Sequence, residues 1–126
     1  MKDLTILLDA TPGGVLGVLA ALTEGGVNVQ AGCLFSRTEG PVMHLAVEDD
    51  AVATAVDVLS RSGHAPSDQR VVVVPLRDQQ VVDVLEVMRD LAAAGVMPTT
   101  AYLGAGGRLV VGAADLDAAR AALSGV

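Results

Sequence analysis

The fold of this chain is decided at one short stretch, Asp9-Ala10-Thr11-Pro12-Gly13-Gly14-Val15. Before it, apolar side chains alternate along residues 4–8, which predicts a short and mostly buried strand. After it, apolar residues recur at helical spacing from 15 to 22, which predicts a helix. Pro12 suits the first helical turn, because its fixed φ fits a helix and its missing N–H would be unpaired there.

This strand-to-helix turn has the chemistry to hold a small zwitterion. Gly13 and Gly14 keep side chains away, so the N–H groups at the helix start can be approached closely. Unpaired N–H groups and the helix dipole favour a carboxylate or a phosphate. Asp9 and Thr11 add an anionic acceptor and a hydroxyl, which either bind an ammonium group or cap the helix. A tight connection without a ligand is the alternative.

The composition narrows the class of protein. A chain of 126 residues forms one ordinary domain or two very small ones that share a core. It is 52% hydrophobic and 18% charged, which indicates a folded protein. One Tyr, one Phe and a net charge of −7 argue against base stacking and against attraction to phosphate backbones. We therefore expect neither nucleic acid nor an anionic membrane as a partner.

The cellular compartment is inferred from three features. Met1-Lys2-Asp3 leads directly into the first strand, without the pattern of a signal peptide. The longest apolar runs have the length of a strand and are too short to span a bilayer. The single cysteine, Cys33, cannot form an internal disulfide. These features predict a soluble cytoplasmic protein.

The first half of the chain is predicted to be β-α-β-β-α with a weak final strand. Gly25 and Gly26 end the first helix where a left-handed cap is needed. A strand over 27–35 and its partner over 41–47 form a hairpin, and 64–69 is a short last strand. Three acids open the second helix, where the dipole favours them: Glu48, Asp49 and Asp50.

The second half repeats this order. A strand over 71–76, a helix over 80–94 with Gly95 as its cap, a hairpin over 99–113 and a helix over 115–123 are expected. The helix over 80–94 is expected to face inward with Val81, Val84, Leu85, Met88 and Leu91. Five pairs of matching residues are 69 positions apart: Asp9 and Asp78, Leu16 and Leu85, Leu22 and Leu91, Gly26 and Gly95, and Val27 and Val96. This register indicates a duplication, with one domain over 1–68 and another over 69–126.

The duplication predicts an α+β fold of two ferredoxin-like βαββαβ units packed through antiparallel sheets. A unit of this size is marginal alone, because it buries too little surface. Two units whose sheets join edge to edge or face to face cover each other's apolar sides and open strand edges. We expect a pseudo-twofold within the chain and further pairing into a homodimer.

The duplicated unit resembles the ACT domain, a ferredoxin-like module that senses amino acids. The motifs that carry the resemblance are Pro12-Gly13-Gly14 after the first strand and Gly26-Val27-Asn28-Val29 after the first helix. The chain is similar to small stand-alone proteins made of two tandem ACT domains and no enzyme. The resemblance implies that an amino acid binds between two paired units, with backbone donors from the first loop and a polar side chain after the first helix.

The resemblance implies a set of ligand-binding residues in the first unit. An asparagine amide suits an amino acid, because it donates to a carboxylate and accepts from an ammonium. A turn-forming asparagine is the alternative interpretation at this position. The implied residues are Asp9, Ala10, Thr11, Pro12, Gly13, Gly14, Val15 and Asn28.

The second unit departs from the pattern. Its loop reads Arg77-Asp78-Gln79-Gln80-Val81, without Pro or a Gly pair, and Met97 replaces the asparagine. One functional loop per chain is therefore expected. Arg77, Asp78 and Gln80 are the residues through which the second unit would contribute, and a solvated surface arginine is the alternative for Arg77.

Other reactive residues support neither catalysis nor a metal site. Cys33 and His44 become cross-strand neighbours if the hairpin turn is centred on Thr38 and Glu39, and we interpret them as a buried thiol beside a half-buried imidazole. No further ligand completes a metal site, and no nucleophile with a base can be assembled. We expect no enzyme, no cofactor and no metal.

The sequence thus predicts a non-catalytic sensor of a small amino acid, preferably small or aliphatic. The N–H groups of Gly13 and Gly14 would take the carboxylate, and Asn28 or Asp9 the amine. The alternative is a ligand-free dimerisation or docking module that regulates a partner enzyme.

Overall fold

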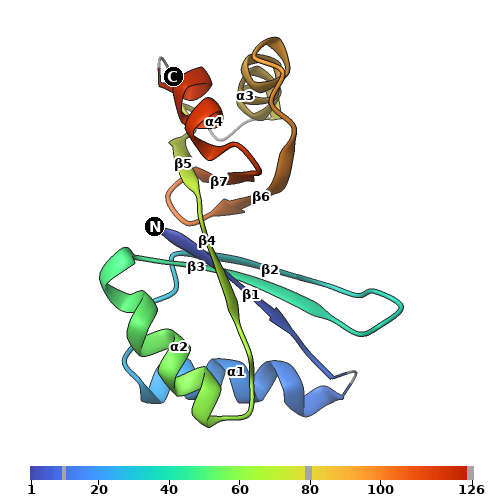
Figure 1. Ribbon diagram of the computed structural model, residues 1–126, viewed down its shortest axis with the longest axis vertical. Helices are drawn as coiled ribbons and strands as arrows, with labels where there is room; N and C mark the ends of the chain where they lie inside the picture. Colours follow the sequence, from blue (N-terminus) through green and yellow to red (C-terminus); the bar gives the residue numbers. More distant parts are fainter. Residues whose placement is uncertain (10, 79–80, 125–126) are drawn as a thin grey trace. The chain divides into compact units, whose positions relative to one another are not determined.

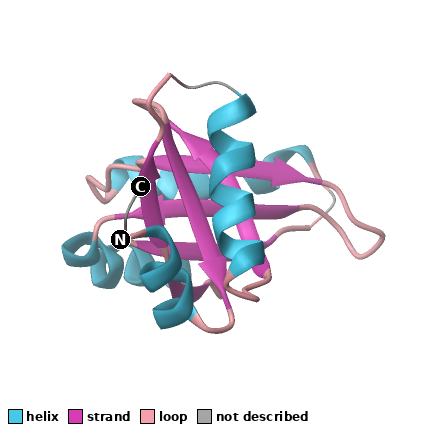
Figure 2. Cartoon of the chain, turned by 90° about the horizontal axis from the view of Figure 1, so that it is seen from above, coloured by secondary structure: helices cyan, strands magenta, loops and turns pink. Residues whose placement is uncertain are grey.

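The computed structural model describes residues 1–9, 11–78 and 81–124, so Ala10 and Gln80 lie outside the described residues. The chain divides into two compact units, residues 2–69 and residues 70–126, with Met1 counted in the second. Both units contain helices and strands (Figure 2). None of the helices in the described part of the chain is both long and apolar enough to cross a bilayer.

The first unit is a complete ferredoxin-like βαββαβ unit. Its strands run in the order β4-β1-β3-β2, and β3 pairs antiparallel with both β1 and β2. Its elements are β1 (Lys2–Leu7), α1 (Pro12–Glu24), β2 (Ala31–Phe35), β3 (Val42–Val47), the 3-10 turn η1 (Asp49–Ala51), α2 (Val52–Arg61) and β4 (Ser67–Arg70), labelled in Figure 1.

The second unit repeats the order βαββα in its described residues, without a counterpart of β4. Its strands run in the order β6-β7-β5, with β7 antiparallel to both neighbours. Its elements are β5 (Val72–Pro75), α3 (Val81–Ala93), β6 (Pro98–Gly104), β7 (Arg108–Ala113) and α4 (Leu116–Leu123). The predicted α+β class with two ferredoxin-like units is confirmed.

Each unit has its own hydrophobic core. In the first unit, alternate residues of β1 and β3 face the helices, as the period of two requires, and Val18 and Leu22 of α1 and Leu59 of α2 cover them. In the second unit, Val87 and Leu91 of α3 cover β5 and β7 in the same way. Each fully buried Leu or Val contributes about 1.5–3 kcal/mol of hydrophobic stabilisation.

One residue of α3 was assigned to the wrong face from the sequence. Leu85 was expected to face inward, but it is 46% exposed. Val84, Met88 and Leu91 pack in or against the core as predicted, and so does Val87. Leu85 lies about 100° around the helix from Val84, which turns it away from the sheet.

The predicted glycine caps after the first helix of each unit, α1 and α3, are confirmed. Gly26 has φ +70°, its N–H donates to the Thr23 oxygen at 3.1 Å, and the N–H of Val27 donates to the Leu22 oxygen at 3.0 Å. This pair of bonds is a Schellman motif, and Gly95 forms the same motif after α3 with φ +72°. The chain leaves α1 in a turn, so the strand expected over 27–35 begins only at Ala31.

Candidate ligand-binding site

The strand-to-helix turn of the first unit has the backbone that its sequence predicts. Thr11 is the N-cap, with extended backbone at φ −127° and ψ 148°, and Pro12 occupies the first helical turn. The Thr11 hydroxyl makes no capping hydrogen bond. The N–H of Gly14 donates to the Thr11 carbonyl oxygen at 3.2 Å, so this N–H is already paired and does not have the role toward a ligand that the sequence predicts. Asp9, Thr11, Pro12 and Gly13 are exposed, whereas Val15 packs against the core.

The two glycines of this turn have different roles. A Cβ on Gly14 would lie 3.3 Å from the Asp9 oxygen, so Gly14 allows the close approach of strand end and helix start. A Cβ on Gly13 would meet no atom within 4 Å. The surface above Gly13 is therefore open to a ligand, as the interpretation of the loop requires.

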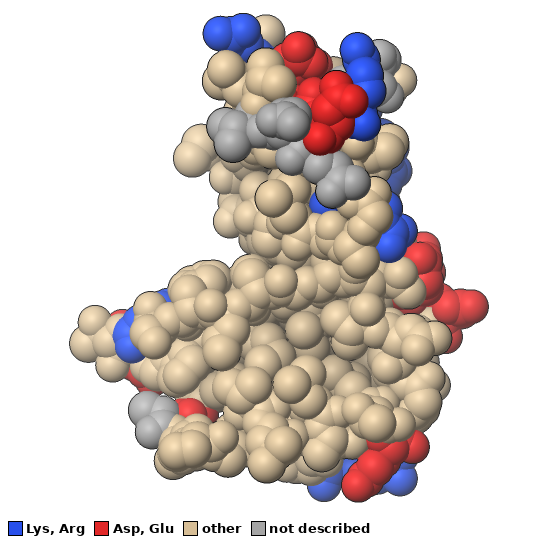
Figure 3. Space-filling view, turned by 180° about the vertical axis from the view of Figure 1, so that it is seen from behind, with Lys and Arg blue, Asp and Glu red and all other residues tan. Residues whose placement is uncertain are grey.

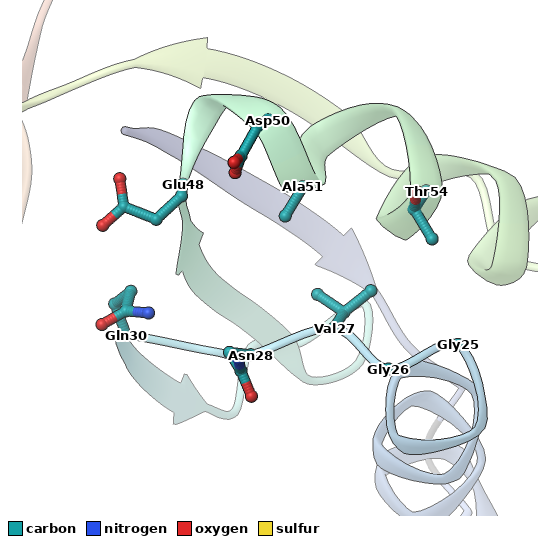
Figure 4. A pocket seen from close by; sticks show the side chains of 9 residues that line it. All are labelled: Gly25, Gly26, Val27, Asn28, Gln30, Glu48, Asp50, Ala51 and Thr54. Carbon is teal, nitrogen blue, oxygen red and sulfur yellow. The ribbon is translucent and has the colours of Figure 1, made fainter.

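Asn28 lies in a cavity at the other end of α1. The cavity has a volume of about 330 Å³ and lies between the turn that follows α1 and the start of α2 (Figure 4). Glycines of the Schellman turn form part of its wall, and a Cβ on Gly25 would lie 2.8 Å from Val58 Cγ1 of α2. The polar side chains that line it are Asn28, Gln30, Glu48, Asp50 and Thr54.

The second unit has a cavity at the corresponding place, with a different lining. It measures about 270 Å³ and lies between the turn after α3 and the start of α4. Met97 replaces Asn28 and is 79% exposed. The carboxylate of Asp115 caps α4, since its Oδ1 accepts from the N–H of Ala118 at 3.0 Å. The cavity of the first unit is therefore lined by two amide side chains and by two carboxylates that cap no helix, and the cavity of the second unit has no such lining.

The residues proposed for the second unit lie around its own strand-to-helix loop. Arg77 is exposed and lines a cavity of about 280 Å³ together with Leu76, Asp83 and Glu86. Asp78 is exposed, and its N–H donates to Asp83 Oδ2 at 3.0 Å. This hydrogen bond joins Asp78 to the first turn of α3.

The two halves of the predicted site are well separated in one copy of the chain. Residues 11–15 contain the N-cap and the first turn of α1, and Asn28 follows its last turn. At 1.5 Å per residue, the 13 residues of α1 span about 20 Å. A single small amino acid therefore cannot contact both ends within one copy.

A polar cluster lies on the sheet face opposite the helices of the first unit. The predicted cross-strand pair of Cys33 and His44 is confirmed by the register of β2 and β3, although Cys33 is only partly buried. His44 Nδ1 lies 3.0 Å from Oδ2 of Asp3, which is fully buried. Thr5 donates to the same Asp3 oxygen at 2.8 Å, and Gln69 of β4 does so at 3.4 Å.

Sequence reasoning missed Asp3 as a member of this cluster. The signal was present, because Asp3 and Thr5 alternate with Leu4 and Ile6, and Thr5 pairs with His44 across the ladder. Alternation places these polar side chains on one face. The cluster links β1, β3 and β4 by hydrogen bonds.

The chemistry of this cluster is structural. Burial, followed by the charge of Asp3, raises the pKa of the Cys33 thiol, and a hydrogen bond with the His44 backbone lowers it in part. A thiol with a raised pKa forms little thiolate at neutral pH and is a weak nucleophile. In the parts of the chain that the structure describes, no three His, Cys, Asp or Glu side chains are placed to hold a metal.

Comparison with known proteins identifies the fold. A protein from Bacteroides thetaiotaomicron superposes with a TM-score of 0.85 at 21% identity, over 98% of this chain and 86% of that one. The ligand-free regulatory subunit of aspartate kinase from Thermus thermophilus superposes with a TM-score of 0.72 at 17% identity, over 98% and 88%. The corresponding Thermus flavus subunit gives 0.69 at 16%, over 98% and 90%. No family model and no curated relative matches the sequence.

Proposed function

We propose that this chain is a non-catalytic regulatory protein that binds a small amino acid through its first unit. The observation that carries the proposal is the cavity of about 330 Å³ beside Asn28, whose polar lining its counterpart in the second unit lacks. The ACT resemblance supports this proposal, and so does a fold similar to that of regulatory subunits.

The two ends of α1 offer complementary groups. The backbone N–H of Gly13 at the start of α1, next to the open surface above this residue, suits the ligand carboxylate together with the helix dipole. The Asn28 side-chain oxygen accepts from the ligand ammonium. Because these groups lie about 20 Å apart in one copy, the loop of one copy and Asn28 of another form the complete site.

An antiparallel pair of α1 helices from two copies creates this arrangement. It places the start of one α1 beside the end of the other, as a twofold axis requires. The outer face of α1 is suited to such a contact, because Leu16 is 70% and Leu19 is 44% exposed and Glu24 is the helix's one charged residue. Figure 3 shows a face of the first unit with charged side chains only at its margins. A helix that is apolar on all sides is usually buried.

A thermal-shift panel of the standard amino acids tests the proposal. A ligand at a hundred times its dissociation constant stabilises by about 2.7 kcal/mol, which raises Tm by several degrees. Gly13→Asp and Asn28→Ala should each abolish that shift while leaving the unliganded Tm unchanged. Met97→Ala, at the corresponding position of the second unit, is the matched control and should keep it.

The second candidate function is a ligand-free docking module that regulates a separate enzyme. The exposed apolar face of α1 favours it, because this face needs a partner but no ligand. A flat panel from a chain that forms a stable dimer would support this function instead. In the sensor function, by contrast, ligand binding should tighten the pair of copies and so shift the population toward the dimer.

A further inference from the structure

Two carboxylates line the Asn28 cavity, whereas the positive charges of the N-terminus and of Lys2 act on Asp49, which stands between these two acids in the sequence. Glu48 and Asp50 lie on the η1 side, across the cavity from Asn28 and Gln30 (Figure 4). No Lys, Arg or His is among the lining residues. Within residues 1–9, 11–78 and 81–124, neither carboxylate has a hydrogen-bond or ion-pair partner.

Helix capping does not explain these carboxylates. Glu48 is the N-cap of η1 and Ala51 that of α2, and neither cap has a side-chain hydrogen bond. The second unit shows the capping alternative at the same place, since the Asp115 carboxylate accepts from the Ala118 N–H at 3.0 Å. In the first unit, favourable interaction with the helix dipole remains, but both carboxylates are available to a ligand.

The negative charge of Glu48 and Asp50 determines which ligand side chain can bind beside them. An aliphatic side chain would displace water from the carboxylates without forming hydrogen bonds to them, which is unfavourable. An ammonium or guanidinium group would form charge-assisted hydrogen bonds and relieve the repulsion between the two acids.

We propose that the ligand is an amino acid with a cationic side chain, which Glu48 and Asp50 recognise while Asn28 holds the α-amino group. This inference rests on the proposed function and replaces the sequence-based preference for a small or aliphatic ligand. The charged groups that recognise the ligand are partly exposed to solvent, so the affinity for the ligand should fall as the salt concentration rises.

Isothermal titration with matched ligands tests the selectivity. Lysine is compared with norleucine, and arginine with citrulline, in the presence of EDTA so that a bound divalent cation is not mistaken for the ligand. A partly exposed charge pair of up to about 1 kcal/mol predicts that at least one cationic ligand binds about fivefold more tightly than its neutral counterpart. Asp50→Asn and Glu48→Gln should each reduce this ratio toward one.

Asp90→Asn provides the matched control, because this exposed acid of α3 in the second unit does not line the cavity. It changes the net charge equally and should leave the ratio unchanged. Norleucine or citrulline binding as tightly as the cationic ligand would overturn the selectivity but leave the proposed function intact. Failure of every amino acid to bind would overturn both. Since Glu48 and Asp50 are exposed, their variants should retain the unliganded Tm, which the same samples report.

Discussion

His44 Nδ1 lies 3.0 Å from Asp3 Oδ2, and Asp3 is fully buried although it is the third residue of the chain. This pair joins β1 to β3, and Thr5 and Gln69 also donate to the Asp3 carboxylate. Buried polar groups that are fully paired hold strands in one register, and unpaired ones are costly.

Asp3→Ala should therefore destabilise the protein by about 1–3 kcal/mol, because Thr5, His44 and Gln69 lose their shared acceptor. Urea unfolding at neutral pH measures the change. Asp57→Asn is the matched control: it removes an exposed carboxylate that pairs with Arg61 at 2.7 Å, and should cost less than about 0.5 kcal/mol. Equal effects of the two variants would contradict a structural role for the cluster.

Cys33 should react slowly with iodoacetamide in the folded protein. Burial and the charge of Asp3 raise the pKa of this thiol, so the rate should rise at a higher pH than for the urea-unfolded chain. Asp3→Asn removes the charge that contributes to the shift and should move the pH profile toward lower pH. A folded-state profile that coincides with the unfolded one would show that Cys33 is not shielded.

Gly40→Ala should destabilise the first unit by about 1–3 kcal/mol. Gly40 has φ +124°, and an added Cβ would lie 2.7 Å from the Leu8 oxygen. Gly13→Ala is the informative comparison, because its Cβ meets no atom within 4 Å and a helical glycine gains from replacement by alanine. Thermal unfolding should show a lower Tm for the first variant and an equal or higher Tm for the second.

Leu16→Lys tests the pairing of copies through α1. Leu16 is 70% exposed, so the substitution should change the stability of a single copy by less than about 0.5 kcal/mol. It should nevertheless shift the protein from dimer to monomer in sedimentation analysis, because two lysines would face each other across the twofold axis. Leu85→Lys, at the matching position of α3, should leave the dimer intact. A dimer that survives Leu16→Lys would place the contact elsewhere.

The pattern of elements was readable from the sequence, because the signals are local. Pro12 before a helix and Gly26 and Gly95 after one act within a few residues of themselves, and all three occupy the predicted places. The spacing of 69 between matching residues then predicted two similar units. The candidate ligand residues Gly13 and Asn28 came from these same local motifs.

The surroundings of these residues were decided by the tertiary structure. Glu48 and Asp50 line the same cavity as Asn28 because the turn after α1 packs beside the start of α2, which no local pattern specifies. Asp3 is buried because strand pairing joins it to residues 41 and 66 positions further along the chain. Backbone preferences act over one or two turns, whereas burial and charge environment arise from contacts between distant segments. The sequence alone therefore determined the two-unit fold, and packing determined the chemistry of the cavity.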